Sequence, residues 1–566
     1  MMKSGKMANQ AFRAGAAAML LALVPVTGFS AEKFQFVGFD ETALSPEASE
    51  GLREVFNDRS EFSSGMPLNL VKAMVQAEAK QNPGYDPTSV EGKFFSSGAL
   101  PSPPSRGVDE SIALGQTTFT RDGAMFSSGN CFSCHAGMVN GTVVAGMGNN
   151  SVMQSPPRPE GTKSPNMMAL ASALKTDAER EAVQKMMSRM KDRSGGPSLN
   201  LPPTTSRGDN YGPFGVWAKG TRLTDPKNLG LVTGDGPPEL AKLIEESMLP
   251  PVNPMPWWLM KYKTRDYWYG DGAPDDAAHF SFNFSGTGTV ANDQHVAHVE
   301  STAKVLAFAR ETVSPIYPGT LDADLVQKGS DLFHGRKEPA DTTAFKTCME
   351  CHGSYVRKSA FPDLTQPGHY EVIYSGSDEL KSVRTDSEYN KIVQKFMPIN
   401  EHISKLVDYY EAREMSELGT LYAPLEGKGY VAPPLDGVWA TAPYFHNGAV
   451  PTIAAVLNSE SRPEIWSREP SPRAYDLDRL GLIYTELSRE EYNAQIDTSS
   501  EAAYKTKDSL SQMFLYDTEG FGRAKKGHTF GDSLTADERA AIIEFLKSLS
   551  GPDMTGKPHT VKQAKL

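Results

Sequence analysis

The pattern of hydrophobic and polar positions is clearest near the C-terminal end of the chain. Thr535 and Glu538 have the spacing of a capping box, which is typical of a helix start. The apolar positions that then recur at helical intervals are Ile542, Leu546 and Leu549. The Ser-Gly-Pro sequence at 550–552 ends this pattern. A helix is therefore predicted just before residue 552, and the polar residues 553–566 are expected to form a loose tail.

A second pattern occurs twice along the chain. In segment 110–120 Gly115 lies four residues before Phe119, and in segment 325–333 Gly329 lies four residues before Phe333. On a helix, the glycine would allow a crossing helix to approach closely, and the aromatic ring would pack against it. We therefore predict one such helix in each segment.

The N-terminus has the pattern of an export signal. Lys3, Lys6 and Arg13 precede an apolar run at 14–28, and small residues offer a cleavage site near residue 30. A membrane anchor is the alternative, but the run is short and contains a proline. We therefore expect a periplasmic or secreted protein without an integral membrane anchor after signal cleavage.

Composition and charge limit the possible classes of protein. The chain has 566 residues, 39% of them hydrophobic, which is enough for a large core in two or more domains. Its net charge is −12, and this acidic balance argues against nucleic acid as a partner. Proline and glycine are concentrated in loop-like stretches such as 155–166, 194–216 and 247–256.

The cysteines carry the most specific chemical signal. All four occur in two Cys-x-x-Cys-His segments, which are Cys131-Phe132-Ser133-Cys134-His135 and Cys348-Met349-Glu350-Cys351-His352. This is the attachment signature of c-type haem, in which each thiol bonds to a vinyl group and the histidine binds the iron. The sequence therefore predicts two covalently bound haem c groups.

Other interpretations of the cysteines remain open, which are a zinc site or a pair of disulfides. A zinc site would need four soft ligands that converge in space, and a thioredoxin-like site would need one Cys-x-x-Cys beside a strand and a helix. Neither a zinc site nor a thioredoxin-like site explains why a histidine follows both cysteine pairs. Haem attachment is therefore favoured.

These signals predict a mainly α fold with two cytochrome c-like haem domains, long loop-rich insertions and few strands. The helical composition of residues 290–312 suggests that this segment closes the first domain. The predicted divisions are a signal peptide at 1–30, an N-terminal extension at 31–107, the first haem domain at 108–312, the second at 313–552, and a polar tail at 553–566.

The two haem motifs occur together with a longer stretch, Leu435-Asp-Gly-Val-Trp-Ala-Thr-Ala-Pro-Tyr-Phe-His446-Asn-Gly, and with Gly527-His528-Thr-Phe-Gly before the last helix. With these features the chain resembles the bacterial dihaem cytochrome c peroxidase superfamily. The long insertions resemble its larger branch, which includes MauG-like enzymes and dihaem rubber oxygenases. The resemblance covers residues 108–552.

The resemblance implies different roles for the two haems. The N-terminal haem would be the reactive centre, with His135 as its protein ligand and an accessible opposite face. The second haem would be six-coordinate, with His352 and His528 as its two ligands. A bis-histidine haem has no open position, so it transfers electrons but binds no oxidant. Histidine at position 528 resembles the rubber oxygenases most.

Some of these residues have simpler explanations. His528 could be an exposed residue in a turn. His446 could be hydrogen-bonded near the haems without binding iron, and we favour that supporting role. By resemblance, Thr441 and Pro443 match positions whose oxygens hold a calcium ion between the haems, although no carboxylate cluster marks the site.

The pocket of the first haem is harder to predict. Segment 256–270 is rich in tryptophan and tyrosine, and such clusters most often form packed core. By resemblance, Trp258 would line the distal cavity or stand between the haems, which makes it a candidate catalytic residue. His279, His295 and His298 are candidates for proton delivery, but exposure on a polar helix is expected for His295 and His298.

Two mechanisms fit this architecture. The N-terminal haem would use peroxide as a peroxidase, or dioxygen as an oxygenase acting on a hydrophobic substrate. The expected partners are a periplasmic electron donor or a small hydrophobic molecule. The alternative is a non-catalytic periplasmic electron carrier, in which a distant methionine or histidine would also close the first haem.

Overall fold

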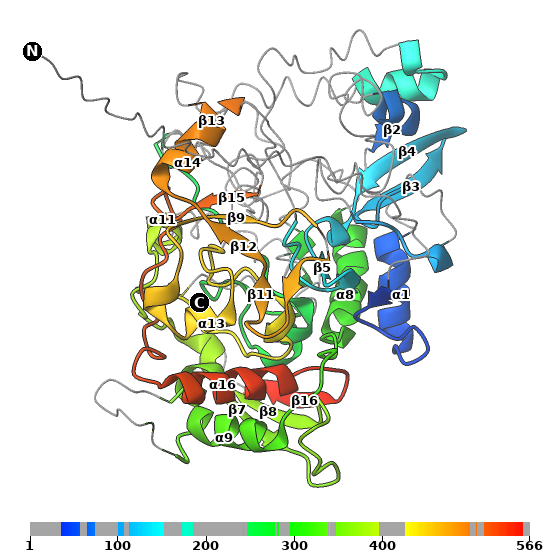
Figure 1. The fold of residues 1–566 in the computed structure, drawn as a ribbon. Coiled ribbons are helices and arrows are strands. Elements are labelled where there is room, and N and C mark those ends of the chain that lie inside the picture. Colours follow the sequence, from blue (N-terminus) through cyan, green and yellow to red (C-terminus); the bar gives the residue numbers. More distant parts are fainter. Residues whose placement is uncertain are drawn as a thin grey trace, which may run out of the picture.

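The computed structural model describes most of the chain in fifteen stretches (Figure 1). These are residues 35–56, 65–73, 100–106, 112–151, 172–184, 242, 246–277, 280–281, 295–337, 339, 347–395, 425–471, 473–497, 505–506 and 514–558. The predicted signal peptide at 1–30 and the candidate His279 lie outside them.

The predicted C-terminal helix is confirmed as α16 (Ala536–Ser548), and the capping box is formed in both directions. It crosses α9 (Ala323–Phe333), which is the helix predicted around Gly329. A Cβ at Gly329 would lie 1.9 Å from the carbonyl oxygen of Ala541 on α16, and the rings of Phe333 and Phe545 pack 5.3 Å apart. Gly329 therefore allows the two helices to approach closely, as predicted.

A second helix pair uses the same contact. In Figure 1, α1 (Pro46–Phe56) lies beside α8 (His295–Glu311), and α8 confirms the helix predicted within 290–312. A Cβ at Gly51 would lie 2.0 Å from the carbonyl oxygen of Lys304 and 3.0 Å from Cβ of Phe308. The partner of α8 thus comes from the segment that was predicted to be an extension before the first domain.

The helix predicted around Gly115 and Phe119 is wrong. Residues Gln116–Arg121 form strand β3, which pairs in a hairpin with β4 (Ala124–Gly129). The connecting residues, Asp122 and Gly123, both have positive φ, as a tight two-residue hairpin turn requires. An Asp-Gly pair is a sequence signal for such a turn, and it outweighs the spacing of glycine and phenylalanine.

The first haem motif is followed by another hairpin. Strands β5 (Ala136–Val139) and β6 (Thr142–Ala145) are joined by Asn140 and Gly141, which also have positive φ. Strand β1 (Gln35–Val37) adds to β6 in parallel, and β2 (Met66–Pro67) adds to β4. Residues from the predicted N-terminal extension therefore complete both sheets.

The polar tail is not loose where the structure describes it. Residues Met554–Pro558 form β16, which pairs in parallel with β8 (Tyr370–Tyr374), and β8 pairs with β7 (Ser354–Arg357). Met554 is buried. The prediction failed because a short polar strand is stabilised by its ladder of backbone hydrogen bonds, which composition does not report.

The remaining elements are short, and many are strands. The further strands are β9 (Ile465–Arg468), β10 (Tyr475–Asp476), β11 (Gly481–Leu482), β12 (Tyr484–Glu486), β13 (Ile496–Asp497), β14 (Lys505–Thr506) and β15 (Leu515–Asp517). The further helices are η2 (Pro104–Arg106), η3 (Cys131–Ser133), η5 (Trp257–Tyr262), α10 (Met349–His352), η7 (Gly376–Asp378), α11 (Glu388–Lys395), η10 (Val438–Ala440), α13 (Ile453–Val456), η11 (Ser459–Ser461) and α14 (Arg489–Gln495). The fold is thus mixed and loop-rich: the predicted loop-rich character is confirmed, whereas a mainly α chain with few strands is not what the described residues form.

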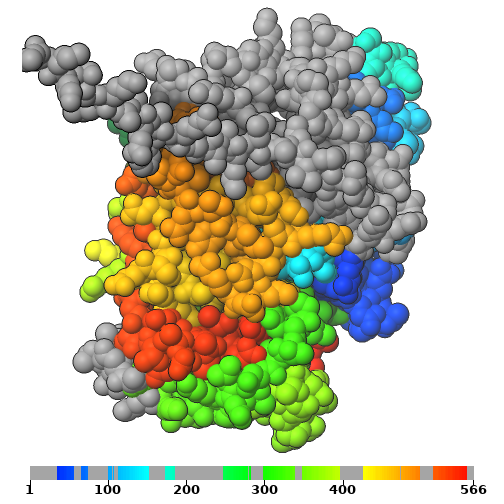
Figure 2. All heavy atoms as spheres, in the orientation of Figure 1, coloured from blue at the N-terminus to red at the C-terminus, as the bar shows by residue number. Residues whose placement is uncertain are grey.

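Two large apolar clusters hold the described elements together. One surrounds α1, α8 and Phe132 of the first haem motif, and the other surrounds α9, α16 and the sheet of β7, β8 and β16. In Figure 2 the chain from residue 425 onward, in yellow and orange, covers the side of the molecule above the red α16. No helix among the described residues is long and apolar enough to cross a membrane.

Candidate functional site

The first haem motif lies on a 3-10 turn between two hairpins. The side chain of Asn130 caps η3 by accepting a hydrogen bond from the amide of Phe132 at 2.9 Å. His135 follows directly, and its ring stacks on Trp257 with centroids 5.0 Å apart and planes 22° apart. Burial lowers the pKa of His135 to about 4. The imidazole is therefore neutral at physiological pH, as an iron ligand must be.

The second haem motif lies at α10, which ends with His352. The Nδ1 atom of His352 is 2.7 Å from the carbonyl oxygen of Pro433, which fixes Nδ1–H as a donor and leaves Nε2 free. Burial lowers the pKa of His352. A backbone acceptor on one nitrogen is the usual support for a metal-bound histidine.

His528 faces His352 from a distant part of the chain. The two rings are tilted by 59° and their centroids are 6.2 Å apart. With metal–nitrogen bonds of about 2 Å, two imidazoles on opposite sides of one metal ion place their centroids about 6 Å apart. The spacing of His352 and His528 therefore matches that of two axial ligands of one haem.

His528 is buried and is not a residue of an exposed turn. Its backbone has a φ of 48°, and its amide donates to the carbonyl oxygen of Val383 at 2.8 Å. Burial, followed by the charges of His352 and Arg462, lowers the pKa of His528 to about 3. The Nδ1 atom of His528 is buried and has no hydrogen-bond partner.

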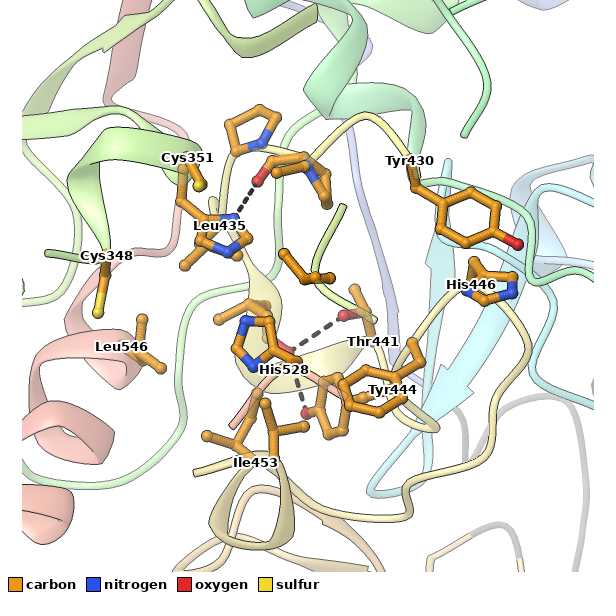
Figure 3. A pocket seen from close by; sticks show the side chains of 18 of the residues that line it. Cys348, Cys351, Tyr430, Leu435, Thr441, Tyr444, His446, Ile453, His528 and Leu546 are labelled. Carbon is orange, nitrogen blue, oxygen red and sulfur yellow. Dashed lines mark hydrogen bonds between the residues drawn. The ribbon is translucent and has the colours of Figure 1, made fainter. Parts of the chain in front are cut away.

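A cavity of about 250 Å³ lies between these histidines and the cysteines of the second motif. In Figure 3, Cys348 and Cys351 lie on one side of it, Tyr430 and His446 lie on the other, and His528 lies between them. The lining is mainly apolar and includes Leu435, Ile453, Val456, Leu534, Ile542 and Leu546. An apolar cavity with two thiols at one edge and two neutral imidazoles suits a covalently attached haem.

The alternatives for the cysteines gain no support. No disulfide joins any of the four cysteines, and burial raises the pKa of the Cys348 thiol to about 12. Among the described residues, no three His, Cys, Asp or Glu side chains are grouped as a protein-only metal site.

His446 lies at the far wall of the same cavity. It is 3% exposed, stacks on Tyr430 with centroids 3.9 Å apart, and has an Nε2 atom without a partner. Burial lowers its pKa to about 3. This placement fits a neutral supporting residue beside the cofactor, and its role stays a prediction.

The two neighbouring tryptophans of the aromatic segment have different contacts in the structure. Trp257 contacts His135, whereas Trp258 is fully buried and donates from Nε1 to the carbonyl oxygen of Asp436 at 2.8 Å. Trp258 therefore lies in packed core next to the second cavity, and its catalytic role stays a prediction. The candidate His298 is also buried, with Nδ1 2.6 Å from Ser281 Oγ, so the expected exposure is wrong.

The predicted calcium positions line a small cavity of about 20 Å³. The hydroxyl of Thr441 donates to Val438, and the carbonyl oxygen of Pro443 accepts from the side chain of Asn253 at 2.9 Å. The described residues that line this cavity include no carboxylate, so calcium stays a prediction resting on neutral oxygen atoms.

A buried carboxyl group at the cavity wall was missed by the sequence analysis. Asp436 is 1% exposed, and its oxygens accept hydrogen bonds from Ser314 at 2.5 Å and Tyr262 at 3.0 Å. Burial raises its pKa to about 6. Only folding brings these residues together, because Tyr262, Ser314 and Asp436 are far apart in sequence.

The comparisons with known proteins agree with the position of this site. A family described as "RoxA-like, cytochrome c-like" matches residues 429–467. The chain contains a RoxA-like, cytochrome c-like domain. The matched residues include Pro433, Asp436, His446 and much of the cavity wall, whereas His352 and His528 lie outside the match.

Two proteins of Sinorhizobium fredii are similar over shorter stretches. Uncharacterized protein y4iJ is 36% identical over 140 residues, which cover 23% of this chain and 19% of that protein. Uncharacterized protein y4iM is 48% identical over 134 residues, which cover 21% of this chain and 27% of that protein. The chain thus matches less than a third of the length of either relative.

Proposed function

We propose that this protein is an exported dihaem c-type oxidoreductase. Its second haem would be attached to Cys348 and Cys351 and held by His352 and His528, and it would supply a one-electron couple for electron transfer. The observation that carries this proposal is the 6.2 Å spacing of the two imidazoles beside an apolar cavity that both cysteines line.

The first haem would be attached to Cys131 and Cys134 and would be the reaction site. A bound haem c supplies a one-electron couple and, where a coordination position is open, a binding site for peroxide or dioxygen. His135 would bind from the protein side as a neutral imidazole, and the stacked ring of Trp257 would hold its orientation. A peroxidase-like and a rubber-oxygenase-like activity are both compatible with this arrangement.

Helix η5 connects the two proposed centres. Trp257 at its start contacts His135, and Trp258 contacts the backbone of Asp436, which lines the cavity of the second centre. These two buried tryptophans, adjacent in the chain, thus each contact a residue of a different proposed centre. Trp257 and Trp258 would support electron transfer between the two haem groups, with a periplasmic donor as the source of electrons.

The cofactor content tests the proposal first. We expect intact mass and a haem assay of exported, full-length protein to give two covalent haems per chain. Two double variants extend the test: alanine replaces Cys131 and Cys134 in one, and Cys348 and Cys351 in the other. Each double variant should contain one haem less than the parent. A single haem in the parent protein would refute the dihaem assignment.

Carbon monoxide binding then distinguishes an oxidoreductase from a non-catalytic electron carrier. In an oxidoreductase, carbon monoxide should bind one ferrous haem, and this signal should vanish when Cys131 and Cys134 are replaced. EPR should show the other haem as low-spin. Two haems that both resist carbon monoxide would favour a non-catalytic electron-transfer cytochrome.

A further inference from the structure

The segment that carries His528 is held by one buried arginine. Arg462 is 3% exposed, and each of its five N–H groups donates to a backbone carbonyl oxygen. The acceptors are Ala455 at 3.0 Å, Val456 at 3.0 Å, Lys525 at 2.9 Å, Gly527 at 2.6 Å and His528 at 2.9 Å. The guanidinium therefore has no donor left for another partner.

These acceptors lie on two separate segments. Ala455 and Val456 belong to α13, which forms part of the cavity wall, and the other three precede or include the proposed ligand. His528 has a left-handed backbone, which is costly for a residue other than glycine and persists only where surrounding contacts fix it. Arg462 supplies such contacts and ties the wall to the ligand segment.

The charge of Arg462 is not neutralised by its hydrogen-bond partners, because all five are uncharged carbonyls. Although burial lowers its pKa to about 10, Arg462 is protonated at neutral pH. The carboxylate of Asp532 opposes this positive charge and raises the pKa of Arg462. Asp532 is exposed, and its carboxylate accepts two hydrogen bonds from Ser459. The Phe445 ring is near both side chains: its centroid lies 5.0 Å from Cζ of Arg462 and 5.9 Å from the centroid of the His528 ring.

The two proposed axial histidines have different support. His352 donates from Nδ1 to the carbonyl oxygen of Pro433, whereas Nδ1 of His528 has no acceptor. An acceptor on the second nitrogen makes a metal-bound imidazole more basic. His528 is therefore the weaker electron donor of the pair, and the buried cation lies on its side.

We propose that Arg462 is a positioning residue that fixes His528, and that its positive charge raises the reduction potential of the haem iron bound there. This inference rests on the proposed function of the His352 and His528 pair. A cation in a low-dielectric interior favours the ferrous state, which carries one positive charge less than the ferric state.

The test compares haem-loaded, full-length variants by optical redox titration and EPR. We expect Arg462→Gln to lower the potential of the low-spin haem by at least a tenfold change in its equilibrium with a one-electron mediator, which is about 59 mV. Part of that haem should also become high-spin. Arg462→Lys should keep the potential, because it keeps the charge, but should also give some high-spin haem. Arg479→Gln is the control, because it removes a cation that is exposed.

Three results would overturn the inference. The first is an Arg462→Gln protein with full haem content whose potential and spin state match the Arg479→Gln control. The second is an Arg462→Lys potential as low as that of Arg462→Gln. If neither Arg462 variant folds, Asp532→Asn decides: it removes the acid that opposes the cation, so the potential should rise, and an unchanged or lower potential is the third refuting result.

His528→Ala separates this inference from the proposed function. A low-spin second haem that persists in His528→Ala removes the proposed ligand, and the proposed function fails with it. A change to high spin in His528→Ala, together with an unaltered Arg462→Gln protein, refutes the role of Arg462 alone.

Discussion

The buried carboxyl of Asp436 makes a specific prediction about stability and pH. The single hydrogen of the Tyr262 hydroxyl faces two acceptors, which are Oδ2 of Asp436 and the carbonyl oxygen of Met554, each at 3.0 Å. One hydrogen atom cannot form a full hydrogen bond with both acceptors. A proton on Asp436 resolves the conflict, because the acid can then donate to Tyr262 while Tyr262 donates to Met554. Asp436→Asn is expected to do the same with its amide group.

The magnitude follows from the shift in pKa. Folding raises the pKa of Asp436 from 3.8 to about 6, mainly through burial. The folded protein therefore binds more protons than the unfolded chain between these values, and its stability falls as the pH rises through this window. A shift of about two units corresponds to about 3 kcal/mol, which is fully lost above pH 7.

The assay is thermal or urea unfolding of the parent and the variant at pH 4.5 and pH 8. Asp436→Asn should be more stable than the parent at pH 8, by up to about 3 kcal/mol, and the difference should shrink at low pH. Asp553→Asn is a control with the opposite sign, because hydrogen bonds from Lys358 and His369 lower the pKa of Asp553. A constant difference between Asp436→Asn and the parent at both pH values would refute the reasoning.

Three further predictions concern packing and capping. Gly329→Ala should destabilise the protein by about 1–3 kcal/mol, because its Cβ would overlap Ala541, whereas Gly129→Ala, with nothing within 4 Å, should be nearly neutral in the same unfolding assay. Thr535→Ala should cost about 1 kcal/mol of unfolding free energy, since it removes the cap of α16, and an unchanged midpoint would contradict the cap's contribution. Trp257→Ala should alter the EPR signal of the first haem and spare that of the second, and equal changes in both would contradict the contact with His135.

Local sequence signals predicted the structure correctly where neighbouring residues decide it. The capping box at Thr535 and the helical spacing after it predicted α16, and Gly329 predicted the close crossing of α9 over it. The same reasoning failed at Gly115, because the Asp-Gly turn after Arg121 favours a hairpin over a helix. The Asn140-Gly141 pair is an equally strong sequence signal for a hairpin turn, and both residues have positive φ.

Other features depend on contacts between distant segments. The partner of α8 could not be found from sequence, because Gly51 in α1 matches the contact of Gly329 but lacks an aromatic residue four positions later. Strand β16 exists because β8 supplies its hydrogen-bond ladder. Neither pairing leaves a periodic pattern in the residues that form it.

For the candidate site, the sequence by itself determined that two Cys-x-x-Cys-His segments are present, and it predicted their attachment chemistry, because two thiols and a histidine must be adjacent in the chain to hold one haem. Only the tertiary structure decided which side chains from distant segments lie near each Cys-x-x-Cys-His segment. It brought His528 to 6.2 Å from His352, placed Trp257 and not Trp258 against His135, and enclosed the charge of Arg462 behind the ligand segment. The physical reason is that burial and the distance between remote side chains depend on how the whole chain packs, whereas covalent spacing is fixed within five residues.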